Sequence, residues 1–266
     1  MSGVTTSGQP YQRVFPAMYG PAPFINPGGV VNAASFAAGA PGAAGSIASV
    51  FGTNLALETA SAPSTPLPTT LGEAQMVFNA DSPAPLFFTS PNQVNIQIPW
   101  NLNQASLTDN IEGLPSPLIT VNLAPFAPGI YTTNSMGTGQ GNIIIANTNP
   151  PAIAAPTGAF PGSRPVVRGS EYISIYCTGL GAVTNQPASG SPASASPLSQ
   201  ATTTPTVSIG GVAATVTFSG LAPGLAGLYQ VNALVPATAP IGDAVPVVLS
   251  IGTATSNTVT IAVKQP

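Results

Sequence analysis

A seven-residue stretch that occurs twice constrains the fold of this chain more than any other feature. Segment 93–99 reads Gln-Val-Asn-Ile-Gln-Ile-Pro, and segment 230–236 reads Gln-Val-Asn-Ala-Leu-Val-Pro. In both segments the apolar residues fall on every second position, which is the period of a half-buried strand. A closing proline ends each strand because it has no N–H to give to a neighbouring strand. Two copies of one strand indicate two copies of one domain.

A second matched pair supports the duplication. Segment 47–55 reads Ile-Ala-Ser-Val-Phe-Gly-Thr-Asn-Leu, and segment 172–180 reads Tyr-Ile-Ser-Ile-Tyr-Cys-Thr-Gly-Leu. Self-similarity of this kind predicts the number of domains better than length does. The 266 residues also suffice for two domains of about 100 to 130 residues each. We therefore predict a Pro-rich extended arm, a first β-sandwich domain and a second β-sandwich domain, at 1–28, 29–134 and 135–266.

Short strands separated by Pro, Gly and Asn turns are predicted in both domains, and no helical period appears. The strands expected in the first domain are 30–33, 47–52, 74–79, 85–89, 94–99 and 118–123. Those expected in the second domain are 143–147, 172–177, 206–209, 214–218, 229–235, 245–251 and 258–263. This pattern is typical of an all-β protein.

Two segments between strands are predicted to be irregular. The glycine-rich segment 137–141 is expected to form a flexible joint between the domains. Segment 184–205 consists almost wholly of Ser, Thr, Ala, Pro, Gln and Gly, so it is expected to be a surface loop that does not pack. Cys177, the only cysteine, lies in an alternating strand and is expected to be buried.

The scarcity of charge excludes several classes of partner. Only 4% of the residues are charged, against roughly 25% in ordinary soluble domains, and the net charge is −3. Such a chain has no basic surface for nucleic acid or for anionic lipid. Pro, Gly, Ser or Asn interrupts every apolar run, so membrane insertion is not expected. A secretory signal is not visible in this numbering.

Composition also argues against an enzyme. The chain has no histidine, so Ser-His-Asp and Cys-His catalytic groups and imidazole metal sites are excluded. Asp109 and Glu112 are close enough to share a loop, which we interpret as solvated because calcium needs more oxygen ligands than two carboxylates. Arg164 and Arg168 are expected to pair with Glu171 at the surface. We expect no cofactor, no metal and weak dependence of stability on pH and salt.

Several motifs together resemble a known family. They include Gly-Gly-Val-Val-Asn-Ala-Ala-Ser-Phe at 28–36, Pro-Leu-Pro-Thr-Thr-Leu-Gly at 66–72, Pro-Asn-Gln-Val-Asn at 91–95, Pro-Gly-Ile-Tyr at 128–131 and Gly-Leu-Tyr-Gln-Val-Asn at 227–232. In these motifs, residues 28–264 resemble the Solibacter-type C-terminal domain of acidobacterial secreted proteins, whose function is uncharacterised. The resemblance implies an extracytoplasmic β-sandwich and supplies no catalytic residues.

Each half also resembles an immunoglobulin-like domain of the IPT/TIG kind, in which Gly-Thr-Asn-Leu at 52–55 would be the turn that follows a strand. The expected fold class is therefore all-β, with two tandem immunoglobulin-like β-sandwich domains and an extended N-terminal arm. Fold alone does not assign a function to such domains.

The N-terminal arm carries the candidate assembly residues. Its prolines at 10, 16, 21, 23 and 27 exclude a helix, and it has too few apolar residues for a core of its own. A small apolar and aromatic cluster could dock on its own first domain or on a neighbouring copy, and it consists of Tyr11, Val14, Phe15, Met18 and Tyr19.

The function that we expect is a self-assembling subunit of an extracellular or cell-surface filament, a pilus-like homopolymer joined head to tail through the arm. Surfaces that lack charge tolerate burial between subunits, and sandwich edges accept added strands. The alternative is a secreted carbohydrate-binding or adhesive module for extracellular polysaccharide. In that case Trp100 with Tyr131 or Tyr229 would form an exposed stacking platform.

Overall fold

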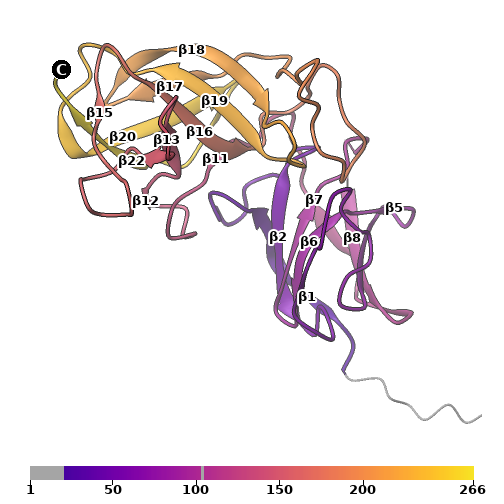
Figure 1. Ribbon diagram of the computed structural model, residues 1–266. Helices are drawn as coiled ribbons and strands as arrows, with labels where there is room; N and C mark the ends of the chain where they lie inside the picture. Colours follow the sequence, from indigo (N-terminus) through magenta and orange to yellow (C-terminus); the bar gives the residue numbers. More distant parts are fainter. Residues whose placement is uncertain (1–20, 103–104) are drawn as a thin grey trace, which may run out of the picture.

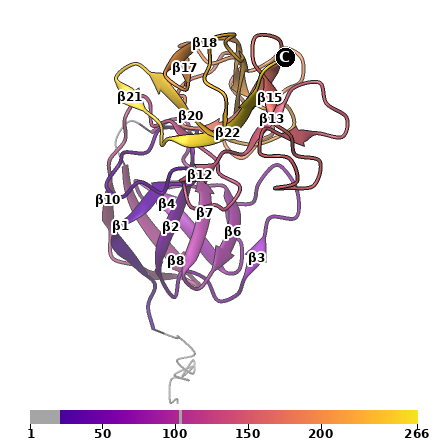
Figure 2. The same ribbon diagram turned by 90° about the vertical axis from the view of Figure 1, so that its left-hand side faces the viewer.

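The computed structural model describes residues 21–102 and 105–266, and every regular element in these residues is a β-strand. Strands β1 to β10 pair only with one another, and strands β11 to β22 pair only with one another. The chain therefore folds into two immunoglobulin-like β-sandwiches in tandem, joined end to end (Figures 1 and 2). The expected fold class is confirmed.

The first sandwich consists of two five-stranded sheets. One has the order β1-β2-β7-β6-β3, with bounds Phe24–Asn32, Ile47–Thr53, Gln93–Gln97, Leu86–Ser90 and Ala60–Ser61. The other has the order β10-β8-β4-β5 with β9 paired to β8, and the bounds are Ile119–Val121, Ala105–Ile111, Ala74–Phe78, Ser82–Pro83 and Leu114–Pro115. Alternate residues of β4 and β8 are buried, which places one face of this sheet on the core.

The second sandwich is one continuous set of twelve strands. Its long strand β18 (Val212–Leu221) pairs with β17 through its first residues and with β19 through its last residues, so it connects the two layers. One layer contains β17, β20, β22, β12, β15 and β21, with bounds Thr206–Ile209, Gly242–Ile251, Val259–Lys264, Gly139–Gln140, Val166–Val167 and Ala254–Thr255. The other contains β19, β16, β13, β14 and β11, with bounds Tyr229–Leu234, Tyr172–Thr178, Ile143–Ile145, Ala152–Ile153 and Gly129–Ile130.

The two repeated segments occupy the same place in the two sandwiches. In the first, β2 pairs with β7 so that Ser49 lies opposite Asn95. In the second, β16 pairs with β19 so that Ser174 lies opposite Asn232. The Gln side chain of each repeat donates to the Asn Oδ1 two residues later, at 2.8 Å in both copies. The duplication in the sequence is therefore a duplication of strand pairing, register and side-chain hydrogen bonding.

Each sandwich has its own apolar core. The first is formed around the largest side chains of the facing sheets, among them Phe78, Met76, Leu86, Ile96 and Leu107. The second is larger and includes Ile143, Ile175, Tyr229, Val247 and Ile261. Burial of each such side chain contributes roughly 1.5 to 3 kcal/mol to the stability of the fold. This is more than a single hydrogen bond between strands contributes.

Most expected strands occur within two residues of their predicted positions, but one long strand and several two-residue strands are not among those predicted. Strand β8 (Ala105–Ile111) is central to its sheet, yet Asp109 stands where the apolar alternation requires a hydrophobic residue. Strand β1 begins at Phe24, inside the segment assigned to the arm, and β11 (Gly129–Ile130) already pairs with β16 of the second sandwich. The predicted domain limits at 28 and 134 stay predictions.

The expected flexible joint at 137–141 is wrong. Gly139 and Gln140 form β12, which runs parallel to β22, and Asn257 donates a 2.7 Å hydrogen bond to the carbonyl of Gly137. A Cβ on Gly137 would lie 2.2 Å from the carbonyl oxygen of Ser35, a residue of the first sandwich. Glycine is therefore present here for close packing, because no side chain fits at this contact.

Candidate functional site

The two sandwiches meet at a junction held by hydrogen bonds between buried groups. The N–H of Ile47, at the start of β2, donates to Thr178 Oγ1 over 2.9 Å. Gln97, at the end of β7, is buried, and its Oε1 accepts from the N–H of Gly190 at 2.6 Å while its Nε2 donates to the carbonyl of Gly45 at 3.2 Å. The bonds to Thr178 and Gly190 hold one domain against the other, and the bond to Gly45 orients the Gln97 side chain within the first sandwich.

Segment 184–205 is exposed over much of its length, as expected for a surface loop, but it also packs against the first sandwich, so the expectation that it does not pack is wrong. Ser189 Oγ accepts from the N–H of Trp100 at 3.1 Å, and the carbonyl of Gly190 accepts from the N–H of Leu67 at 2.9 Å. Ser199, within the same segment, is fully buried. Small side chains let this backbone approach the first domain closely, and backbone hydrogen bonds supply the attraction.

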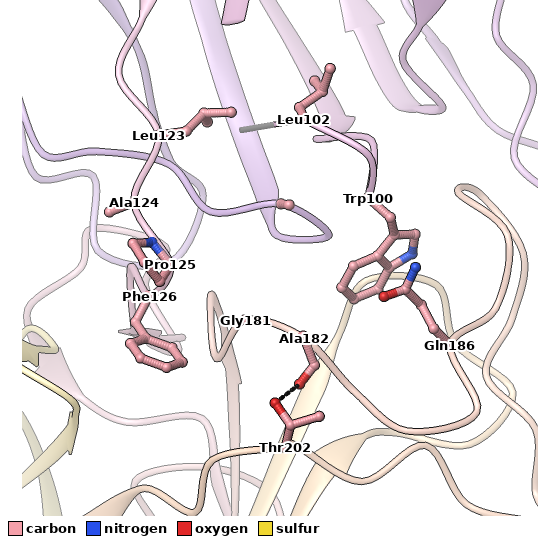
Figure 3. Close-up of a pocket in the computed structure, with 11 residues that line it drawn as sticks. Trp100, Leu102, Leu123, Ala124, Pro125, Phe126, Gly181, Ala182, Gln186 and Thr202 are labelled. Atoms are coloured by element: carbon pink, nitrogen blue, oxygen red, sulfur yellow. Dashed lines mark hydrogen bonds between the residues drawn. The ribbon is translucent and has the colours of Figure 1, made fainter. Parts of the chain in front are cut away.

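Trp100 closes the other side of the junction. Its ring covers Gly45, where an added Cβ would lie 2.0 Å from the ring, and it packs against the core of the second sandwich. Beside it lies a pocket of about 330 Å³, with Leu102 and Leu123 on the first domain and Gly181, Ala182 and Thr202 on the second (Figure 3). Trp100 and Phe126 stand on opposite sides of this pocket (Figure 3). Trp100 is therefore an interdomain plug.

A larger hollow, which we call the junction groove, lies between the domains at β2, β6, β11 and β16. It has a volume of about 730 Å³. Its lining has no charged side chain and consists of Ile47, Ala62, Pro63, Ser64, Thr65, Leu67, Phe87, Tyr131, Asn142, Tyr176, Gly224, Leu225, Ala226 and Leu228. Leu225 is 47% exposed. The junction groove is an apolar surface large enough for several side chains of a partner.

The expected aromatic stacking platform does not form. Tyr229 is fully buried in the second core, where its hydroxyl donates to the carbonyl of Gly181. Tyr131 lines the junction groove, whereas Trp100 lines the pocket on the other side. The three rings belong to three different environments. The sequence did not predict the aromatic residues that meet in the groove, which are Phe87, Tyr131 and Tyr176. These residues come from different domains and share no motif.

Asp109 is an isolated buried carboxyl, and the expected solvated loop with Glu112 is wrong. Asp109 is 0% exposed and lies between Leu107 and Ile111 on the core face of β8, opposite Met76. Neither carboxyl oxygen has a hydrogen-bond partner within the described residues. Burial raises the pKa of Asp109 from 3.8 to about 8. Glu112 is exposed in the hairpin turn between β8 and β9. A buried carboxyl with this pKa leads us to expect that stability depends on pH, in place of the weak dependence that composition predicts.

Arg164 pairs with Glu171 at the surface, as expected, but Arg168 does not. Arg164 Nη2 lies 2.7 Å from Glu171 Oε1, and Arg164 Nη1 donates to Oε2 of the same carboxylate at 2.9 Å. This pairing lowers the pKa of Glu171 and raises that of Arg164. Arg168 instead donates to the carbonyl of Ala239 at 2.7 Å. Among the described residues, no three acidic or thiol side chains gather as a metal site would require.

No helix in the described part of the chain is both long and apolar enough to cross a membrane.

Cys177 is buried, as predicted, and burial raises the pKa of its thiol. A thiolate is the reactive form of cysteine, so we expect no labelling of the native protein by a thiol reagent such as DTNB and full labelling after denaturation in guanidinium chloride. Rapid labelling of the native protein would contradict this placement. The measurement also decides whether single cysteines introduced elsewhere can be used without replacing Cys177.

The candidate assembly residues Tyr11, Val14, Phe15, Met18 and Tyr19 lie outside the described residues. The structure does show where the chain continues from them. Strand β1 pairs Phe24 with Thr53, and Thr53 is at the end of β2 opposite to Ile47, which contacts the second domain. The arm is therefore attached at the pole of the first sandwich that faces away from the second.

Comparisons with known proteins place this two-domain β-sandwich chain near no characterised family. No family model and no curated protein matches it. Among solved structures, it is similar over 91% of its length to SGBP-B from a complex xyloglucan utilization locus in Bacteroides uniformis, at 10% identity and a TM-score of 0.28. The chain spans about half of that protein, 49%.

Two further solved structures are similar to this chain. Domains 5–6 of the S-layer protein SbsC match 91% of the chain and 99% of their own length, at 12% identity and a TM-score of 0.25. The I9–I11 tandem of titin matches 84% of the chain and 61% of its own length, at 9% identity and a TM-score of 0.21. We therefore infer function from the residues of this chain alone.

Proposed function

We propose that this chain is a non-enzymatic structural subunit that joins copies of itself head to tail, outside the cell, into a filament at the cell surface. The N-terminal arm makes the joint. The observation that carries the proposal is the attachment of this arm at the pole of the first sandwich, with the second sandwich fixed at the opposite pole. A binding element at one end of a rigid two-domain unit makes a heterologous contact, which generates filaments when it does not close into a ring.

The composition of the chain supports this proposal. Charged residues make up 4% of the sequence, and charged side chains are depleted in the cores of protein interfaces because their desolvation is costly. The rigid junction also supports the proposal, because a subunit that transmits force along a fibre requires domains that do not move freely. Gln97, Trp100 and segment 184–205 supply that rigidity here.

Removal of residues 1–20 tests the proposal. This deletion leaves β1 (Phe24–Asn32) intact, so both sandwiches are expected to fold with an unchanged β-sheet circular dichroism spectrum. The full chain is expected to form fibres in negative-stain electron microscopy and to sediment as a polymer, whereas the truncated chain is expected to remain monomeric. Fibres formed by the truncated chain would contradict the proposal. A full chain that stays monomeric and binds polysaccharide would favour the alternative, a carbohydrate-binding or adhesive module.

A further inference from the structure

We propose that the junction groove of one copy is the acceptor for residues 11–19 of the next copy. This inference rests on the proposed function and names the surface that the arm binds. The candidates for an acceptor are the sheet edges of the sandwiches and the hollows between the domains. The junction groove is favoured by its chemistry, by its position and by the direction in which the arm leaves its own domain.

The lining of the groove matches the arm in chemistry. Its lining carries three aromatic rings, Phe87, Tyr131 and Tyr176, and no charged side chain. Residues 11–19 supply five apolar or aromatic side chains within nine residues, and residues 1–20 contain one charge, Arg13. Aromatic and aliphatic anchors that fill a desolvated pocket contribute most of the affinity of a protein interface. The cavity of about 730 Å³ lies within the usual range for pockets that enclose a ligand, roughly 300 to 1,000 Å³.

The exposed leucine of the groove is also explained by a partner. Leu225 is 47% exposed, and Leu228 beside it is half-buried. The lining also includes the polar side chains of Ser64, Thr65 and Asn142, which can hydrogen-bond to a tyrosine hydroxyl or to the backbone of an extended segment. A mostly apolar lining with a few polar groups is usual for a binding site.

The direction of the chain favours the groove of a neighbour over the groove of the same copy. Ile47 lines the groove, so the groove lies at the junction end of β2, whereas Phe24 pairs with Thr53 at the other end. Pro21 and Pro23 precede β1, and proline fixes φ near −65° and keeps the residue before it out of the helical region. The arm therefore joins the first sandwich at the end away from its own groove.

The length of the arm limits where the neighbouring groove can lie. Counted back from Phe24, an extended chain reaches Tyr19 within about 16 to 18 Å and Tyr11 within about 43 to 47 Å, so the neighbour's groove must lie close to this pole of the first sandwich. Pro10 and Pro16 lack the N–H that a ladder requires, so apolar docking contributes more of the affinity than strand pairing does.

Two matched substitutions in the full chain test the acceptor. Leu225→Arg places a charge in the groove, and Ile241→Arg places the same charge at a side chain of equal exposure, 49%, outside the groove. Leu225→Arg is expected to raise the critical concentration for fibre formation by about tenfold or more, the effect of losing an interface hot spot. Ile241→Arg is expected to leave it unchanged. Both variants are expected to retain the melting temperature of the parent, because both side chains face solvent.

The outcomes separate the acceptor from the proposed function. If Leu225→Arg forms fibres at the parent's critical concentration while deletion of residues 1–20 abolishes them, the arm acts elsewhere and the groove is not the acceptor. If the two arginine variants weaken assembly equally, the effect is one of charge and the groove is again not the acceptor. If the truncated chain forms fibres, the arm is not the joint, and the acceptor and the proposed function are both wrong.

Discussion

Replacement of Asp109 by leucine is expected to raise the free energy of unfolding at pH 7 by about 3 to 4 kcal/mol. In the folded chain this carboxyl is fully buried with a pKa of about 8, whereas its ordinary value is 3.8. At pH 7 unfolding therefore releases a proton and exposes a carboxylate to water, which favours the unfolded state. The second sandwich shows that leucine fits, because Leu249 of β20 takes the place that Asp109 has in β8.

The equivalence of Asp109 and Leu249 is visible in their hydrogen bonds. The N–H of Asp109 donates to Ser116 Oγ at 3.0 Å, and the N–H of Leu249 donates to Ser256 Oγ at 3.0 Å. The N–H of Ser116 in turn donates to the carbonyl of Asp109, and the N–H of Ser256 donates to the carbonyl of Leu249. A hydrophobic residue at position 109 is therefore compatible with the backbone of this hairpin.

The sign of the pH dependence follows from the raised pKa. The stabilisation that depends on Asp109 is fully present below its unfolded pKa of 3.8 and is lost as the pH rises to about 8. Stability should therefore increase on acidification from pH 8 to pH 5. Glu171, whose pKa is lowered, loses its contribution only on further acidification below its ordinary value of 4.5.

Urea denaturation of the parent and Asp109→Leu chains between pH 5 and pH 8 measures this effect. The parent is expected to become more stable as the pH falls, and the variant is expected to change little. Glu112→Gln, at an exposed position of the same hairpin, is the control and is expected to behave like the parent. A parent whose stability is flat, or falls, between pH 8 and pH 5 would contradict the buried, neutral Asp109.

Replacement of Gly45 by alanine is the second change with a large expected effect, a loss of about 2 to 4 kcal/mol. Gly45 has φ of +78°, a conformation that costs an alanine about 1 to 2 kcal/mol. Its added Cβ would also lie 2.0 Å from the Trp100 ring, so the plug of the junction must move. Thermal unfolding of the two chains measures the combined cost.

Gly39→Ala provides a matched control for the backbone strain that a positive φ causes in alanine. Gly39 has φ of +71°, and a Cβ there would have no atom within 4 Å, so its substitution is expected to cost only the backbone strain. In a Trp100→Ala background, Gly45→Ala should likewise cost no more than Gly39→Ala, because the clash is absent. Equal losses for Gly39→Ala and Gly45→Ala in the parent would mean that Trp100 does not rest on Gly45.

The repeat made much of the fold predictable from the sequence. The register of β2 with β7 and of β16 with β19 is the alignment of the two Gln-Val-Asn segments with their Ser-containing partners. Side-chain alternation determines register because a slip by one residue would expose every buried side chain. Tyr229 and Cys177 are buried for the same reason, although Tyr229 was also considered as a ligand platform.

What could not be predicted depends on contacts between domains or on a broken local rule. Strand β8 was not predicted because a carboxylate is disfavoured in a strand core, and only the equivalence with Leu249 in the folded hairpins identifies position 109 as a core position. The sequence contains only a weak indication of the junction between the domains, at Gln97. This residue stands where the second repeat has Leu234, and the structure buries it at the junction. The junction groove has no local signature, because its three aromatic residues come from three separate segments of the two domains.

Cross-linking between two variants that each carry one introduced cysteine tests the central claim most directly. One full chain carries Phe15→Cys in the arm and the other carries Leu225→Cys in the groove, while Cys177 stays buried in both. Under mild oxidation the mixture is expected to yield a disulfide-linked pair with one copy of each chain, in excess of the products of either chain alone. A chain that carries both changes is expected to form linked multimers. A disulfide formed only within such a chain, with no intermolecular product, would contradict head-to-tail assembly through the arm.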